Sequence, residues 1–326
     1  MEKTPIIIDC DPGVDDAQAI ILALSCAEID LKAVCSVTGN GSLENTTRNA
    51  KDLLHLCGRD DIPVYRGCGI GLDGEKPDEV AAFGDDGLGG CAASIASDKG
   101  VEEEHAVDFL VRTVSEHPGE LTIFGIGPLT NIAQAARKDP SFAAQVKRLI
   151  IMGGSCTNGN MSPVAEYNFW ADPLAAHEVF QAGFPAIDVV SFNVTNQIAL
   201  RADVREIFRM LDTPISRFLY DATREGLEDN WHSLGRPVAP EHDVLAVAFL
   251  MDESVVGMRD AYVDVVTEGI ARGQSIVDFD GHWSEGRVNC RFAVTVDEAL
   301  FYRIFLLTVF KDHKDVLERY LDRYFK

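Results

Sequence analysis

Short β-branched runs alternate with longer segments that are rich in alanine and leucine or mix apolar and polar residues. The short runs are typical of buried strands, and the longer segments are typical of helices. We predict strands at residues 6–8, 31–37, 62–65, 121–126, 149–152, 186–192, 262–267 and 291–296, and helices at 17–24, 45–56, 105–115, from 132 onward, 172–182 and at the C-terminus. This alternation predicts right-handed crossovers between parallel strands. The expected fold class is therefore α/β, with an open, mostly parallel sheet and helices on both faces.

Composition bounds the domain count and the class of partner. The 326 residues contain no linker rich in proline, glycine or serine, no internal repeat and no low-complexity tract, so we expect one domain over residues 1–326. The formal net charge of −23 argues against nucleic acid and anionic membrane surfaces as partners. A neutral or cationic small molecule fits this charge better.

The cysteines and the N-terminus limit the redox chemistry and the cellular location that we expect. The eight cysteines occur singly, and no Cys-x-x-Cys pair is present, which argues against a zinc ribbon or a thioredoxin-type site. A strand follows the first few residues directly, and no apolar run is long enough to span a membrane. We therefore expect a cytoplasmic protein.

The densest chemistry lies in residues 9–16, Asp-Cys-Asp-Pro-Gly-Val-Asp-Asp, between the first strand and the first helix. Pro12 and Gly13 predict a tight turn that brings Asp11 back towards Asp15 and Asp16. Helix capping explains one or two acids at this position, but not four. So many carboxylates repel one another unless a cation neutralises them. Oxygen ligands at this density are typical of a Ca²⁺ or Mg²⁺ site.

Other polar residues follow later strands, and from the residues alone each has two interpretations. Asn40 suits a turn in which the side chain bonds its own backbone, and Thr130 or Asn131 suits a helix cap. Asn160, Glu166 and Asn168 form either a solvated loop or a set of donors and acceptors for several hydroxyl groups. His242 and Asp243 precede an apolar helix, where a cap is the simpler explanation.

These motifs together resemble the nucleoside hydrolase family of the inosine–uridine preferring type, over roughly residues 5 to 300. The resemblance rests on the acidic motif at 9–16, on Gly-Pro-Leu-Thr-Asn at 127–131, on Glu-x-Asn at 166–168 after Met-Gly-Gly, and on His-Asp at 242–243. The family cleaves the N-glycosidic bond of ribonucleosides with a Ca²⁺-held water. It therefore implies a nucleoside as substrate, Ca²⁺ as cofactor, and a homodimer or homotetramer.

The resemblance also implies a role for each site residue. The metal ligands are the carboxylates of Asp11, Asp16 and Asp243 and the main-chain carbonyl of Ile126. Asp11 takes the proton of the attacking water, and His242 assists departure of the base as a general acid. The residues that grip the ribose are Asp15, Asn40, Asn160, Glu166 and Asn168.

Three segments depart from the family pattern or have no assigned chemistry. Phe83 stands where the family often has histidine, and residues 193–195 lie where it often has aspartate. We predict a mobile loop over the base at residues 224–240, which include Trp231.

Two other functions compete with this interpretation. One is a haloacid-dehalogenase-like phosphatase with Asp9 as nucleophile and Mg²⁺ as metal, although Pro-Gly follows where such proteins have Gly-Thr. The other is a nucleoside-binding protein that has lost catalysis.

Overall fold

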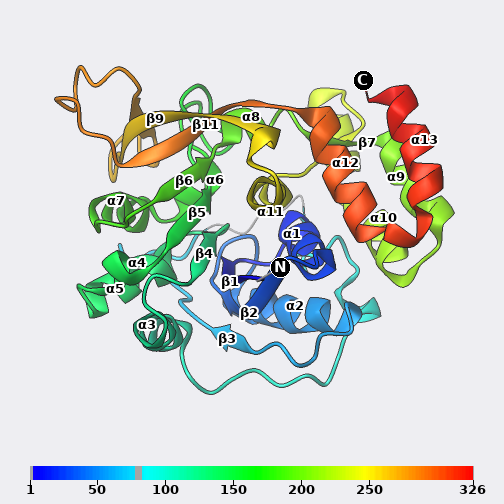
Figure 1. Ribbon diagram of the computed structural model, residues 1–326, viewed down its shortest axis with the longest axis horizontal. Helices are drawn as coiled ribbons and strands as arrows, with labels where there is room; N and C mark the ends of the chain where they lie inside the picture. The colour runs from blue at the N-terminus through cyan, green and yellow to red at the C-terminus, as the bar shows by residue number, and fades with distance from the viewer. Residues whose placement is uncertain (1–2, 78–82, 326) are drawn as a thin grey trace.

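The computed structural model describes residues 3–77 and 83–325, whose centre is one nine-stranded sheet in the order β10-β9-β11-β6-β5-β4-β1-β2-β3 (Figure 1). Neighbouring strands from β3 to β11 are parallel, whereas β9 pairs antiparallel with both β11 and β10. The strands are β1 (Thr4–Cys10), β2 (Ile29–Ser36), β3 (Val64–Arg66), β4 (Thr122–Gly125), β5 (Arg148–Met152), β6 (Ile187–Val190), β9 (Val256–Val265), β10 (Ser275–Asp278) and β11 (Cys290–Val296). The predicted mostly parallel sheet is confirmed.

Helices cover both faces of the sheet, as expected, because its central strands are apolar on both sides. In β1, Ile6 and Ile8 pack into one core and Ile7 into the other, in keeping with the alternation of side chains along a strand. The first core lies against α1 (Val14–Ser25), α2 (Leu43–Leu56), α11 (Asp243–Met251) and α12 (Glu298–Val309). The second lies against α3 (Ala106–Glu116), α4 (Thr130–Lys138), α5 (Phe142–Gln145) and α7 (Pro173–Gln181) (Figure 1).

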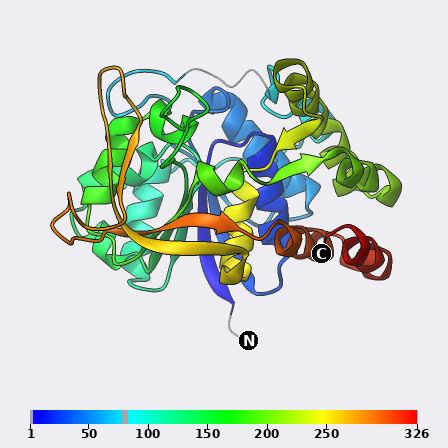
Figure 2. The ribbon, with the colours of Figure 1, turned by 90° about the horizontal axis from the view of Figure 1, so that it is seen from above.

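A group of elements stands outside the central sheet at one end of the molecule (Figures 1 and 2). It comprises α9 (Ala202–Leu211), α10 (Pro214–Leu234), α13 (Lys314–Tyr324) and the two-stranded ribbon of β7 (Ala199–Arg201) and β8 (Val238–Pro240). The mobile loop predicted at 224–240 is therefore wrong. Phe218, Leu219 and Ala222 give α10 a buried apolar face, and the helix continues past Trp231 until Gly235, which has φ 66°, ends it.

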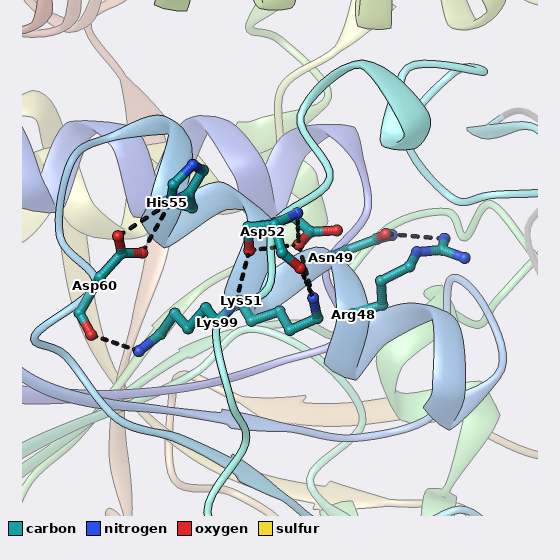
Figure 3. A network of polar contacts seen from close by, with 8 residues as sticks. Arg48, Asn49, Lys51, Asp52, His55, Asp60 and Lys99 are labelled. Carbon is teal, nitrogen blue, oxygen red and sulfur yellow. Dashed lines mark hydrogen bonds and ion pairs between the residues drawn. The ribbon is translucent and has the colours of Figure 1, made fainter.

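The long segment between β3 and α3 carries little regular structure but is tied to helix α2. Residues 78–82 lie outside the described part of this segment. Lys99 donates to the carbonyl of Asp60 at 2.7 Å, and His55 contacts the carboxylate of the same residue (Figure 3). The buried carboxylate of Asp52 accepts hydrogen bonds from both the backbone and the hydroxyl of Ser97. These contacts hold the segment that brings Phe83 to the carboxyl edge of the sheet.

The remaining short helices are α6 (Tyr167–Ala171) and α8 (Phe192–Thr195) with the 3₁₀ turns η2 (Ala92–Ser94), η3 (Glu253–Val255) and η4 (Lys311–His313). In the described part of the chain, no helix has the length and apolar character needed to cross a bilayer. Strand β1 lies between β2 and β4. The chain continues from β1 to β2 and β3 on one side, and it then crosses to β4 on the other side of β1. Such a switch point at the carboxyl ends of parallel strands is where open α/β sheets bind ligands.

Candidate active site

The acidic motif forms the turn from β1 into α1, and one carboxylate caps the helix. Asp16 accepts hydrogen bonds from the backbone N–H of Gly13 at 2.9 Å and of Asp11 at 3.3 Å. Asp243 opens α11, which packs against α1. Each of Asp15, Asp16 and Asp243 presents a carboxylate oxygen within 4.8 Å of those of the other two, and all three residues are buried. Capping thus accounts for one acid, and the fold gathers the others.

Asp11 adjoins this cluster. Two glycines and an asparagine hold its carboxylate in place. A side chain on Gly39 or Gly127 would overlap the Asp11 carboxylate, so the close approach requires glycine at both positions. The backbone N–H of Asn40 donates to Asp11 at 2.6 Å, and the Asn40 amide donates to Asp16 at 3.0 Å. Asn40 therefore orients two carboxylates, which goes beyond the local turn that its position alone would explain.

Crowding and burial change the acidity of these groups. Burial, and then neighbouring carboxylates, raise the pKa of Asp243 well above its ordinary value, and the same two effects lead for Asp11. Burial raises the pKa of Asp15 to about 8 and that of Asp16 to about 6. No lysine or arginine is among the largest contributors to these shifts.

The donor set fits a divalent cation. One carboxylate oxygen of Asp11 and one of Asp15 are buried without a hydrogen-bond partner in the described structure. Unpartnered buried carboxylate oxygens are costly, and a hard cation with oxygen ligands relieves that cost. The predicted metal site is confirmed to this extent, as an acidic cluster suited to a divalent metal.

The opposite wall comes from the loops after β4 and β5. Asn168 donates its amide to the carbonyls of Ile126 at 3.1 Å and of Met152 at 3.0 Å, which leaves the amide oxygen of Asn168 to accept from a ligand. Glu166 caps helix α6 and also accepts from the backbone N–H of Gly154 at 2.8 Å. Burial raises the pKa of Glu166 to about 7.

These walls enclose a pocket with an empty volume of about 520 Å³. Its lining consists of Asp15, Asn40, Phe83, Ile126, Met152, Asn160, Glu166, Tyr167, Asn168, His242 and Asp243. All the site residues named from the sequence are in this lining except Asp11 and Asp16, which are fully buried. Met152 and Tyr167 are additions that sequence reasoning missed, because neither carries a motif of its own.

His242 is fixed by two residues of helix α8. Its Nδ1 lies 2.9 Å from the hydroxyl of Thr195, and its ring centroid lies 5.5 Å from that of Phe192. Burial lowers the pKa of His242 to about 4. The imidazole is therefore neutral near pH 7, and it can act there as a hydrogen-bond donor, in contrast to a cationic acid.

A second pocket adjoins the first and shares Asn160 and His242 with it. Its empty volume is about 1000 Å³, and its lining consists of Asn158, Gly159, Asn160, Phe192, Asn196, Ile198, Ala199, Asn230, Arg236, Val238 and His242. Among the described residues, this lining contains amides, one arginine and no acid, although the chain as a whole carries a net charge of −23. Part of this wall comes from the segment that the sequence predicted as a mobile loop.

The structure overturns one minor assignment and weighs against one rival function. Neither Thr130 nor Asn131 caps α4, because Thr130 donates to Asp172 at 2.7 Å and Asn131 donates to Asp9 at 2.7 Å. Asp9 is fully buried and lines neither pocket. The carboxylate of Asp9 is bound by the amide of Asn131, which suits a structural role and not that of a phosphatase nucleophile.

Comparison with known proteins agrees with this geometry. The family model described as inosine-uridine preferring nucleoside hydrolase matches residues 6–303. The pyrimidine-specific ribonucleoside hydrolase RihA of Salmonella paratyphi A is 36% identical over 283 residues, which cover 84% of this chain and 88% of that protein.

Two solved structures are also similar. The plant nucleoside hydrolase PpNRh1 has a TM-score of 0.89 at 34% identity and covers 94% of this chain and 98% of its own. A purine-preferring ribonucleoside hydrolase from Gardnerella vaginalis has a TM-score of 0.88 at 29% identity. The match covers 95% of this chain and 99% of that one. Because the match extends over nearly the whole chain, this protein belongs to the inosine–uridine preferring nucleoside hydrolase family.

Proposed function

We propose that the chain is a Ca²⁺-dependent enzyme that hydrolyses the N-glycosidic bond of ribonucleosides to ribose and a free base. The observation that carries the proposal is the buried carboxylate cluster, with unpartnered oxygens, beneath a pocket lined by hydroxyl-binding side chains. Membership of the nucleoside hydrolase family supports the same reaction. A silent binding protein would not need several carboxylates at a cost in burial energy.

The cation ligands in this proposal are the carboxylates of Asp11, Asp16 and Asp243 and the carbonyl of Ile126. A cation bound there supplies Lewis acidity, which makes water easier to deprotonate. Asp11 accepts the proton of the attacking water, since its pKa is raised by burial and one of its oxygens has no other partner.

The ribose is held by the remaining side chains of the first pocket: Asp15, Asn40, Asn160, Glu166 and Asn168. Carboxylate oxygens accept from the sugar hydroxyls, and the Asn40 amide is oriented by Asp16 at 3.0 Å. Hydrogen bonds of this kind that strengthen as the ring gains positive charge stabilise an oxocarbenium-like transition state.

The base occupies the second pocket, beyond His242. Amide groups and Arg236 suit a neutral heteroaromatic ring with carbonyl and ring-nitrogen acceptors, and the absence of acids from this lining avoids repulsion of the electron-rich leaving group. Phe83 contributes an aromatic face at the first pocket but no hydrogen bond. Relatives include both a pyrimidine-specific and a purine-preferring enzyme, so the substrate panel must contain both classes.

We also propose that the protein is a cytoplasmic homodimer or homotetramer. The segments that join β9, β10 and β11 expose Ile270, Trp283 and Val288. Large exposed apolar side chains that gather on one part of a surface are typical of interaction sites. Light scattering on the purified protein tests the assembly, and a monomer at micromolar concentration would contradict it.

The decisive experiment measures ribose released from uridine, cytidine, inosine, adenosine and guanosine, alongside phosphate released from p-nitrophenyl phosphate. We expect ribose release that is lost on exhaustive chelation and restored by Ca²⁺, with no phosphatase activity. Asp243→Asn should weaken Ca²⁺ binding in calorimetry, whereas Asp260→Asn, an exposed acid on β9, should not. Full activity after chelation would refute the metal assignment, and binding of ribosides without turnover would favour the silent protein.

A further inference from the structure

The hydroxyl of Thr195 has one hydrogen-bond partner in the described structure, Nδ1 of His242 at 2.9 Å. Thr195 is fully buried on helix α8, so water does not reach its side chain. The ring of Phe192, from the same short helix, lies beside the imidazole and restricts its rotation. Helix α8 therefore contacts His242 with one apolar and one polar side chain.

The direction of this hydrogen bond follows from the partners available. An imidazole nitrogen that carries a proton donates a hydrogen bond, and one without a proton accepts. If Nδ1 carried the proton, it would donate to Thr195, and the buried hydroxyl proton of Thr195 would have no acceptor. A buried donor without an acceptor is costly, so this arrangement is disfavoured. If Thr195 donates to Nδ1, both groups are satisfied and the imidazole proton resides on Nε2.

The Nε2 atom is the free end of the ring. It has no hydrogen-bond partner within the described residues. His242 lines both the first pocket, which we call the sugar pocket because we propose that it holds the ribose, and the second pocket. A proton on Nε2 is thus available to a molecule bound where the two pockets meet.

We propose that Thr195 is a positioning residue that accepts no proton from His242 and keeps the imidazole proton on Nε2, so that Nε2 donates a hydrogen bond to the departing base. The inference rests on the function proposed above. The bond between C1′ and the base nitrogen breaks with its electron pair on the base, and water supplies a hydroxyl to C1′ and a proton to the base. The imidazole keeps its own proton and stabilises the charge on the base.

The tautomer is tested directly by ¹⁵N NMR of the imidazole nitrogens in histidine-labelled, Ca²⁺-loaded protein. The His242 signals are identified as those lost in His242→Gln. We expect a protonated Nε2 and an unprotonated Nδ1 in the parent protein and in Thr195→Ser, which keeps the hydroxyl. In Thr195→Val, which has the same shape without the hydroxyl, we expect a mixture of tautomers. A protonated Nδ1 in the parent would overturn the proposal.

Kinetics provide the second measurement. Thr195→Val should lower kcat for natural ribonucleosides by about ten- to a hundred-fold, since part of the assistance to the leaving group is lost. Turnover of p-nitrophenyl riboside should stay within about two-fold, because its leaving group needs no such help. Thr195→Ser should recover most of the loss.

The matched control is Thr46→Val, which removes a buried hydroxyl from helix α2, far from His242 along the chain; within the described residues this hydroxyl donates to the carbonyl of Leu43. This variant should leave kcat unchanged for both natural ribonucleosides and p-nitrophenyl riboside. Equal losses on both substrates in Thr195→Val would show that Thr195 only supports the fold, and would overturn the proposal. If the parent released no ribose at all, the proposed function would fall, while the NMR result would still decide the tautomer.

Discussion

The amide of Asn131 donates a 2.7 Å hydrogen bond to the carboxylate of Asp9, although 122 residues separate them. The same amide donates to the carbonyl of Ser36 at 3.1 Å, and its oxygen accepts from the backbone N–H of Cys68 at 2.8 Å. One side chain thus joins the ends of β1 and β2 to the start of α4. This arrangement leads to the first prediction.

Asn131→Asp should destabilise the protein by roughly 3 kcal/mol or more, because it replaces a donor by a buried charge that faces two acceptors. Denaturant unfolding measures this change. The control is Asn158→Asp, where the side chain is exposed and its oxygen already accepts from Thr157. A loss below 1 kcal/mol for Asn131→Asp would show that the three contacts contribute little to the fold.

Asp11→Asn should leave the fold intact and lower turnover of ribonucleosides by about two to four orders of magnitude, which is the usual effect of losing an acid–base group. The asparagine keeps an oxygen to accept from the backbone N–H of Asn40. Steady-state kinetics at saturating Ca²⁺ separates this loss from weaker metal binding. Asp85→Asn, in an exposed loop, is the matched control. Activity within a few fold of the parent would remove Asp11 from the role of general base.

His242→Ala should slow natural ribonucleosides far more than p-nitrophenyl riboside, since a good leaving group departs without hydrogen-bond assistance. The two substrates are compared by kcat at the same pH and Ca²⁺ concentration. His282→Ala, which removes an exposed histidine from the segment between β10 and β11, serves as the control and should leave both substrates unaffected. Equal losses on both substrates would show that His242 only positions the sugar.

Glu241 makes the stability of the metal-free protein depend on pH. Burial raises the pKa of this fully buried carboxyl from 4.5 to about 8, and one of its oxygens has no partner in the described structure. Below pH 4.5 the Glu241 carboxyl is protonated in both the folded and the unfolded chain, and its contribution to stability is fully present. As the pH rises from 4.5 to 8, only the unfolded chain releases the proton, so stability falls.

Glu241→Gln, which resembles the protonated acid, should remove this dependence. Its oxygen can still accept from the hydroxyl of Tyr302, which lies 3.3 Å from Glu241. Relative to the variant, the parent should lose a few kcal/mol, on the order of one per pH unit, between pH 5 and 8. Urea unfolding at several pH values checks this prediction. Parallel curves for the two proteins would mean that Glu241 ionises normally.

The sequence predicted the sheet well because buried parallel strands are continuous apolar runs. The segment 121–126, for example, contains β4 at Thr122–Gly125, and the ends differ by a residue or two because the flanking residues are equally apolar. The acids of the site were also recognisable, since four carboxylates in one turn have no ordinary structural explanation. The pocket residues after β4 and β5 needed the family resemblance, because each polar residue alone has a simpler local interpretation.

Two features could not be read from local patterns. Asn131 stands at a helix start, where capping is the expected role, but its partners come from three distant segments. The second half of α10, from Arg224 to Leu234, is mostly polar, and this pattern predicts a loop. The apolar face that fixes the helix lies earlier, at Phe218, Leu219 and Ala222. Long-range contacts decide both cases, and a window along the chain does not contain them.

The two pockets are built by different parts of the fold. Loops at the edge of the central sheet form most of the sugar pocket, whereas α8, α10 and the β7–β8 ribbon supply much of the second pocket from outside that sheet. Asn230 and Arg236 can therefore mutate without disturbing the carboxylates or the strands that carry them. On the proposed assignment of the base to the second pocket, variation confined to this outer wall would give related hydrolases a route to new bases while the chemistry of ribose cleavage is inherited unchanged.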